Sequence, residues 1–225
     1  MRTPAGQIVK RLVGELVVVV LGVMIAIAAD RWNQNRLDRS TATEYSRRLI
    51  NELVADSVRL EEHARAATER RAECVRLYEV IRSTSPDSTA LALYFDATGA
   101  PPPHRGGATF AELQSTGRLG LLPEGIAQLL FDYYGYVDGT LERLENVRRV
   151  DRSAMVEAAN RSGVFMPREM VSAHDFTERL RAYPGIDGVV MGCVAAQASE
   201  AGLVTAFWLP HLSQTLTALR QLTPH

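Results

Sequence analysis

The residues from Leu16 to Ala29 read LVVVVLGVMIAIAA and contain no charged or strongly polar side chain. A bilayer core needs about 20 residues of helix, so this run alone is short for a crossing. It can be extended back to Leu12 and forward to Trp32, which gives a sufficient length. The sequence therefore predicts a transmembrane anchor over 12–32, preceded by a short N-terminal tail over 1–11.

Five residues of this segment are predicted to act at the membrane interface or in helix packing. Arg11 and Glu15 are four residues apart on one helical face, so they can pair near the headgroups, where an unpaired carboxylate is costly. Trp32 lies where aromatic residues are enriched at membrane interfaces. Gly22 and Ala26 form a pair of small residues that would let a second helix approach closely in lipid.

Two other interpretations compete with the anchor. Basic residues before the apolar run and the sequence Ala26-Ile27-Ala28 resemble a cleavable signal peptide, which would release a secreted helical domain. A run of 14 apolar residues is also compatible with a buried core helix. The sidedness of an anchored chain stays open, because arginines from Arg31 to Arg48 favour a cytoplasmic domain, whereas a short basic N-terminus before an apolar run is typical of export.

Residues 33–225 are predicted to form a helical extramembrane domain. The stretch from Thr41 to Arg82 has apolar residues at heptad spacing, and no proline or glycine separates it from the anchor, so the two are expected to form one continuous rod. This 41–82 helix offers a surface for self-association or for a protein partner. The expected packing stripe consists of Leu49, Leu53, Asp56, Leu60, His63, Ala67, Arg70, Cys74, Leu77 and Ile81.

Further helices follow, and no alternating β pattern of useful length appears. Thr109 is expected to cap a short helix that ends at Gly117, and Pro123 is expected in the first turn of a longer helix that continues to about Arg161. The last helix runs from about Ile186 to Leu222 with a kink near Pro210. Its Asp187, Gln197 and Glu200 argue against a second membrane crossing. The fold class is therefore all-α, with three or four main helices packed up and down after the anchor.

The composition and motifs favour no particular chemistry. Across 225 residues the formal net charge is −1, so no basic field indicates a nucleic-acid partner. Phosphate-binding glycine loops, nucleophile elbows and metal-binding motifs are absent from the sequence, and we expect no catalytic residue, cofactor or metal. Whether Cys74 and Cys193 pair cannot be told from their number and spacing. Tyr133, Tyr134 and Tyr136, beside two glycines, are read as core packing or as a ligand pocket.

The order of residues near the N-terminus resembles an uncharacterised family of bacterial single-pass membrane proteins. Gly14-Glu15, the apolar run, Asp30-Arg31-Trp32-Asn33 and Arg36, followed by Tyr45, Leu49, Glu52-Leu53 and Asp56, match its pattern of an anchor leading into a charged helix. Phe110, Leu113, Ser115, Gly117, Leu119, Leu122, Leu129 and Tyr133-Tyr134 resemble a second pattern of that family. Gln34 and Pro123 depart from the two patterns.

The resemblance implies a retained anchor in the bacterial cytoplasmic membrane and a helical domain on the exported side, and it implies no activity. It draws attention to Glu15 and to the turn that contains Ser115 and Gly117. We therefore expect a membrane-anchored interaction or sensory module with the lipid bilayer as one partner. The alternative is an enzyme of unknown reaction with a site between helices near Tyr133, His63 and Cys74.

Overall fold

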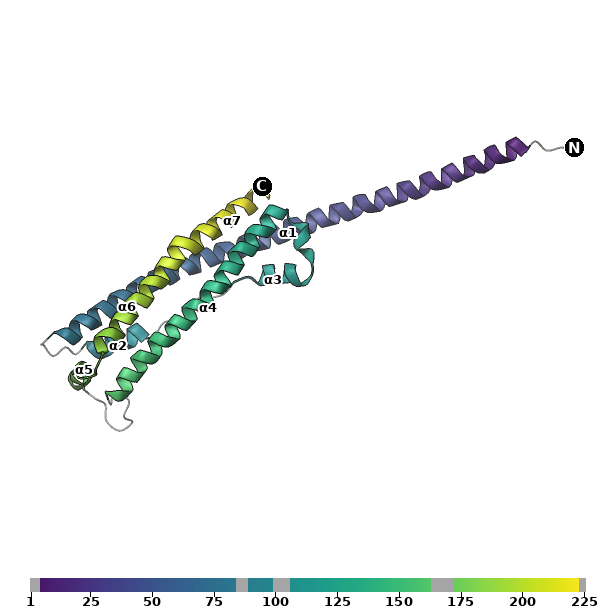
Figure 1. Cartoon of the computed structure of the whole chain (residues 1–225). Coiled ribbons are helices and arrows are strands. Elements are labelled where there is room, and N and C mark those ends of the chain that lie inside the picture. Colours follow the sequence, from purple (N-terminus) through teal and green to yellow (C-terminus); the bar gives the residue numbers. More distant parts are fainter. Residues whose placement is uncertain (1–4, 84–88, 99–105, 163–171, 223–225) are drawn as a thin grey trace.

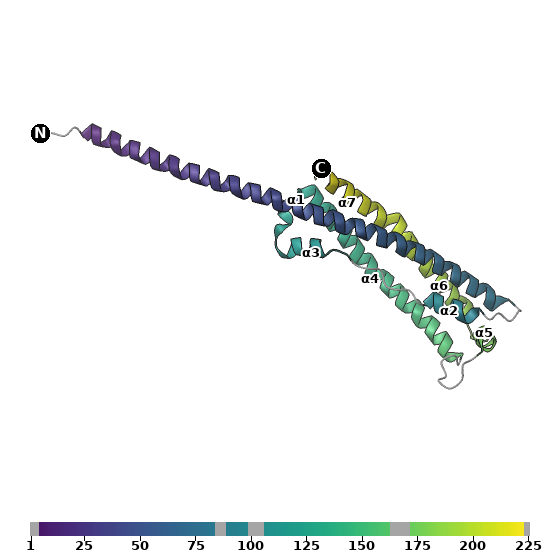
Figure 2. The same ribbon diagram turned by 180° about the vertical axis from the view of Figure 1, so that it is seen from behind.

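A computed structural model describes residues 5–83, 89–98, 106–162 and 172–222. Its first element, α1, is a single helix of 78 residues from Ala5 to Arg82. The predicted continuous rod is therefore confirmed. The first part of α1 projects beyond the rest of the molecule, and only the part after about residue 40 packs against other helices (Figures 1 and 2).

The packed half of α1 buries the face that the heptad spacing predicts. Leu49, Leu53, Ala67, Cys74 and Leu77 are fully buried on this face. A stripe with apolar residues three and four apart places them on one side of a helix, and burial of each large side chain contributes about 1.5–3 kcal/mol. The sequence pattern thus fixes which side of α1 faces the bundle.

Two other long helical segments complete the bundle. One is α4 (Glu124–Arg161), and the other is an unbroken run made of α6 (Ile186–Leu203), the π-helical turn η2 (Val204–Trp208) and α7 (Leu209–Leu222). The α6–α7 run packs against both α1 and α4 and is therefore the central element. A central helix needs apolar side chains on more than one face, which explains its low content of charge.

Short helices close the bundle and determine the chain direction. They are α2 (Ala90–Thr98), α3 (Ala108–Ser115), the 3₁₀ turn η1 (Arg118–Leu121) and α5 (Ala173–Arg181). The segment with α2 and α3 returns the chain toward the start of the bundle, so α4 runs in the same direction as α1, and α6–α7 runs in the opposite direction (Figure 1). The all-α class is confirmed, whereas a strict up-and-down order is wrong.

The predicted helix ends agree with the structure except at two caps. The last helical run spans Ile186–Leu222 as predicted, and a π turn lies just before Pro210, where the missing proline N–H interrupts regular helix bonding. Gly117 adopts a left-handed φ of 67° after α3, as a terminating glycine does. Thr109, in contrast, lies inside α3, and Pro123 precedes α4 rather than standing in its first turn.

The predicted position of the membrane-crossing helix needs a correction. In the described part of the chain, the helical run that is long and apolar enough to cross a membrane is Ile186–Leu222, with about a third of its most apolar window buried. This criterion places the candidate span at Ile186–Leu222 and not at the predicted N-terminal position over 12–32. The same helical run is the central packing element of the bundle, and a core helix satisfies the same criterion of length and composition.

The backbone at Gly107 allows a direct stability test. Its φ is +119°, and a Cβ added there would lie 2.9 Å from Cε1 of Tyr134. We expect Gly107→Ala to lower the free energy of unfolding by about 1–3 kcal/mol, because it combines backbone strain with a clash. Urea denaturation followed by circular dichroism measures this. Gly117→Ala, with φ +67° and open space, is the control, and an equal loss in both variants would contradict the account.

Candidate functional site

A buried carboxylate joins the three long helical segments at the middle of the bundle. Glu200 of α6 is 1% exposed, and its Oε1 contacts Nε2 of His63 on α1. Arg148 of α4 donates from Nε to Oε2 of Glu200 at 2.8 Å and also contacts Oε1 with its terminal nitrogen. One side chain therefore holds partners from two other helices.

A second arginine lies beside this carboxylate. Arg70 of α1 donates from Nε to Oε1 of Gln197 at 3.1 Å, and its Nη2 lies 3.6 Å from Oε1 of Glu200. The second distance is too long for a hydrogen bond. Burial lowers the pKa of Arg70 below its ordinary value, an effect that the charge of Glu200 opposes. His63, Arg70, Arg148, Gln197 and Glu200 are called the buried charged cluster below.

The electrostatics of the cluster keep Glu200 ionised. Burial alone would raise its pKa, but the hydrogen bonds from His63 and Arg148, together with their charges, lower it to about 2. A carboxylate with so low a pKa holds no proton near neutral pH, so it is not poised as a general acid. The arrangement suits a charged bridge that fixes the register of three helices.

Acidification tests this bridge. The pKa of Glu200 falls from an ordinary 4.5 to about 2 on folding, so its contribution is complete above about pH 4.5 and is lost as the pH falls toward 2. That shift corresponds to about 3 kcal/mol. We expect the free energy of unfolding of the wild type to fall by about this amount more than that of Glu200→Gln over this range, measured by urea titrations at several pH values.

At neutral pH, Glu200→Gln is expected to cost about 3–5 kcal/mol, because it leaves buried cations without their counter-charge. The control is Glu157→Gln, which removes an exposed pair with Arg161 and should cost less than about 1 kcal/mol. Parallel pH profiles of the wild type and Glu200→Gln would show that the bridge contributes nothing.

The structure pairs the two cysteines. Cys74 of α1 and Cys193 of α6 form a disulfide, with their Cα atoms 6.1 Å apart and 119 residues between them in sequence. Both lie in a core cluster at the end of the bundle far from the projecting part of α1. The disulfide and the buried charged cluster therefore fasten the same two helices at two levels, and Cys74 holds no thiol for nucleophilic chemistry.

Removal of the disulfide is expected to destabilise the bundle. A bridge that closes so long a loop restricts the unfolded chain, so the double variant Cys74→Ala/Cys193→Ala should lose about 2–4 kcal/mol. Thermal unfolding of the oxidised wild type, the reduced wild type and the double variant measures the loss. Reduction should destabilise the wild type and leave the double variant unchanged; equal stability of all three would contradict the assignment.

The two segments that carry the family resemblance meet at the start of α3. Glu52 of α1 accepts hydrogen bonds from the backbone N–H groups of Gly107 (2.5 Å) and Thr109 (3.0 Å). Partial burial alone would raise the pKa of Glu52, but these bonds and one from the Thr109 side chain lower it. Glu52 thus caps α3 from a distant helix, which is why Thr109 is not needed as the cap.

Aromatic rings pack beneath this cap. Phe110 stacks on Tyr134 with ring centroids 4.6 Å apart, and Tyr133 meets Tyr134 edge to face. Burial raises the pKa of both tyrosines, and the charges of Glu52 and Asp56 add to the effect. Gly106 leaves room for the carboxylate of Asp56, since an added Cβ would lie 2.0 Å from Oδ2. Glu52, Phe110, Tyr133 and Tyr134, which belong to the two resemblance patterns, therefore serve packing and capping.

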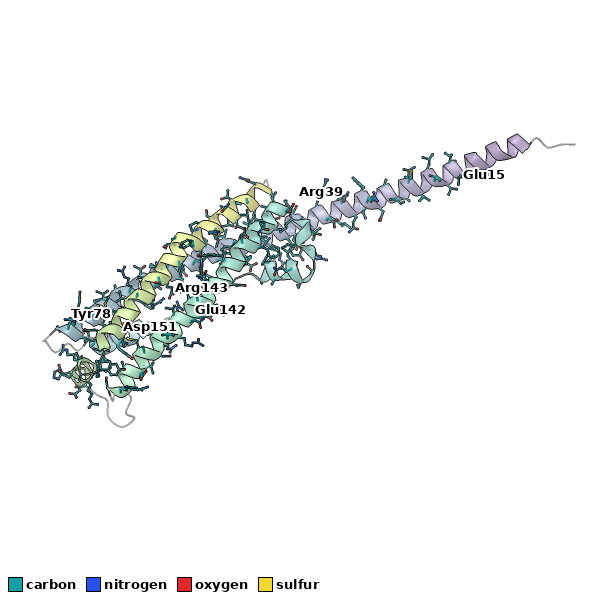
Figure 3. All side chains as sticks on the ribbon, in the orientation of Figure 1. Glu15, Arg39, Tyr78, Glu142, Arg143 and Asp151 are labelled. Carbon is teal, nitrogen blue, oxygen red and sulfur yellow. A yellow bond between two sulfur atoms is a disulfide. The ribbon has the colours of Figure 1, made fainter. Side chains whose placement is uncertain are left out.

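The remaining predicted site residues are spread over exposed surfaces. Glu15 lies near the outer end of the projecting part of α1, and Arg39 lies where α1 enters the bundle (Figure 3). Gly22 and Ala26 are exposed, with no atom within 4 Å of a Cβ built at Gly22, and Trp32 is 68% exposed. The side chain of Arg11 lies outside the described residues, so its pairing with Glu15 stays a prediction.

The predicted turn and the alternative enzyme site are also located. Ser115 Oγ donates to the backbone oxygen of Glu112 at 3.1 Å, so it closes the end of α3 just before Gly117. Tyr133 belongs to the core cluster near α3, Cys74 belongs to the other core cluster, and His63 belongs to the buried charged cluster. These three residues therefore do not form one site.

Sequence reasoning missed the central residue of the cluster. In the sequence Glu200 and Gln197 stand only as polar interruptions of an apolar helix, and no motif marks Arg148. Their spacing of three residues on one helical face was the available signal for a buried polar contact. Within the described part of the chain, no group of three or more metal-ligating side chains is placed to hold a metal ion.

No protein-family model matches this chain. No curated protein and no solved structure matches it either. The resemblance drawn from the sequence therefore stays a prediction.

Proposed function

We propose that this protein is a membrane-associated helical interaction module, in which lipid surrounds the projecting apolar part of α1. The observation that carries the proposal is the exposure of the large apolar side chains between Leu16 and Ile27. All of them are 49–69% exposed in the chain alone. A helix that is apolar on every face requires an apolar environment.

Protein packing does not supply that environment in the described chain. The projecting part of α1 extends away from the bundle in both views (Figures 1 and 2). Each large apolar side chain gains about 1.5–3 kcal/mol when it leaves water, so exposure of the whole run would be strongly unfavourable. A bilayer removes all faces from water together, whereas a single partner helix would cover one stripe.

The other apolar helical run, Ile186–Leu222, contacts α1 inside the bundle. The Ile186–Leu222 run carries Cys193, Gln197 and Glu200, and each of them bonds to a residue of α1. Transfer of this run into lipid would break the disulfide-linked core and bring an ionised carboxylate into hydrocarbon, which is costly. These contacts favour a role for Ile186–Leu222 inside the bundle and leave the apolar part of α1 for lipid.

We further propose that the bundle lies on the exported side of a bacterial cytoplasmic membrane. The disulfide between Cys74 and Cys193 supports this sidedness, because disulfides persist in oxidising compartments and are rare in the cytosol. The bacterial membrane follows from the family resemblance. A count of arginines after the apolar run favours the opposite sidedness, so the redox state of the two cysteines in the membrane-bound protein is the measurement that tests this proposal.

A protein partner would meet a different face of α1 from the one first expected. The heptad stripe of residues 41–82 is occupied by α6 and α7 within the same chain. The opposite face of this segment carries Val54 and Val58, which are 38% and 52% exposed. Self-association or partner binding through α1 would therefore use the outward face around these valines.

Extraction of membranes with alkaline carbonate tests the lipid contact. We expect the full-length wild type to stay with the membrane pellet and Val19→Arg/Val23→Arg to appear in the supernatant. Each arginine within the hydrocarbon costs about 2.5–3.5 kcal/mol. The matched control is Asn33→Arg/Asn35→Arg, which adds the same charge outside the apolar run and should stay in the pellet.

A third variant shows which of the two apolar helical segments contacts lipid. Gly202→Arg adds a charge at an exposed position of α6 with open space around its Cβ, so it should remain in the pellet. Release of the wild type, or release of Gly202→Arg in place of the α1 variant, would contradict the proposal. The intact mass of the pelleted protein distinguishes retention of residues 1–29 from signal cleavage.

A further inference from the structure

A groove lies on the surface of the bundle between α4 and α7. Phe131, Asp132, Gly135 and Tyr136 of α4 line it together with His211 and Gln214 of α7. Its volume of about 520 Å³ is within the range of small-molecule sites. This groove is separate from the buried charged cluster and from the apolar part of α1, so it does not depend on the proposed membrane association.

Aromatic rings form the walls of the groove. Tyr136 stacks in parallel with His211, with centroids 5.5 Å apart and planes within 4°. Phe131 is 45% exposed on the α4 side, and Phe207, 46% exposed, lies beside Tyr136. Stacking on His211 covers one face of Tyr136, whereas Phe131 and Phe207 keep nearly half of their surface in contact with water. An aromatic face in contact with water attracts cations.

The charges around the groove are of one sign. Asp132 is the charged residue among the described lining residues, and Gln128 orients its carboxylate by donating to Oδ1 at 2.8 Å. No lysine or arginine is among these described lining residues. The field at the groove therefore favours a positively charged ligand and opposes an anion.

Gly135 keeps the groove open. No atom lies within 4 Å of a Cβ built at this position, so packing does not require a glycine here. Its φ is not in the left-handed region, so the backbone does not require one either. A glycine in the middle of a helix lowers helix stability relative to alanine. Gly135 forms a floor of the groove without a side chain, so a larger residue at this position would fill part of the groove.

We propose that this groove binds a small organic cation of the quaternary ammonium class. The methylated cation rests against the rings of Tyr136 and Phe131 above Gly135, and Asp132 balances its charge. Such a cation is weakly hydrated and has no hydrogen-bond donor, which matches a groove with aromatic walls and a single carboxylate. The same chemistry occurs in free choline and in the headgroup of a phosphatidylcholine lipid.

Calorimetric titration of choline chloride into the full chain in maltoside detergent tests the proposal. We expect a dissociation constant on the order of 1 mM, and about tenfold weaker binding by Tyr136→Leu and by Asp132→Asn. Gly135→Leu, which fills the floor, should abolish binding. Gly125→Leu, at another open glycine of α4, is the matched control and should bind as the wild type does.

Titration with the neutral isostere 3,3-dimethyl-1-butanol distinguishes the contribution of the ligand's charge to binding from the contribution of its shape. Binding of choline with at least tenfold weaker binding of the alcohol supports a cation site. Equal binding of the two compounds, no heat with choline, or unchanged binding by a correctly folded Gly135→Leu would overturn the proposal. Phosphatidylcholine vesicles that compete with choline identify a lipid headgroup as the source of the cation, whereas choline binding without such competition identifies a free cation.

Discussion

The contact between one face of α1 and the α6–α7 run determines the positions of the other elements. Leu49, Leu53 and Leu77 bury that face along the packed half of α1. Glu200 and the disulfide at Cys193 fasten the same two helices, and Arg148 attaches α4 to the carboxylate. Because α6–α7 lies between α1 and α4, the loss of its register would separate both outer helices from the core.

The other half of α1 projects away from the bundle and packs against no other described helix (Figures 1 and 2). α1 is continuous from Ala5 to Arg82, so its projecting half extends rigidly from its packed half. The packed half has an apolar stripe and charged outer faces, whereas the run from Leu16 to Ala29 is apolar all round. One helix thus carries two patterns of apolar residues. The stripe in its packed half suits a protein neighbour, and the apolar surface on all faces of its projecting half suits lipid.

The sequence predicts the local elements well because helical periodicity is a local property. The buried face of α1, the span Ile186–Leu222 and the left-handed Gly117 follow from spacing and residue type. The cap of α3 by Glu52 and the bridge from His63 to Glu200 could not be predicted, since their partners lie far apart in sequence and depend on the arrangement of helices. The length and hydropathy criterion selects Ile186–Leu222 for a related reason, because a central core helix and a membrane span have similar compositions.

A nitroxide scan over Leu16–Ala29 tests most directly whether lipid surrounds this part of α1. The pairing of Cys74 with Cys193 leaves a cysteine introduced at each of these positions as the reactive thiol. In liposomes, lipid on all faces predicts high oxygen accessibility and low accessibility to a water-soluble nickel complex at every position. An accessibility to nickel that rises and falls with a period of 3.6 residues, or is high throughout, would contradict the account.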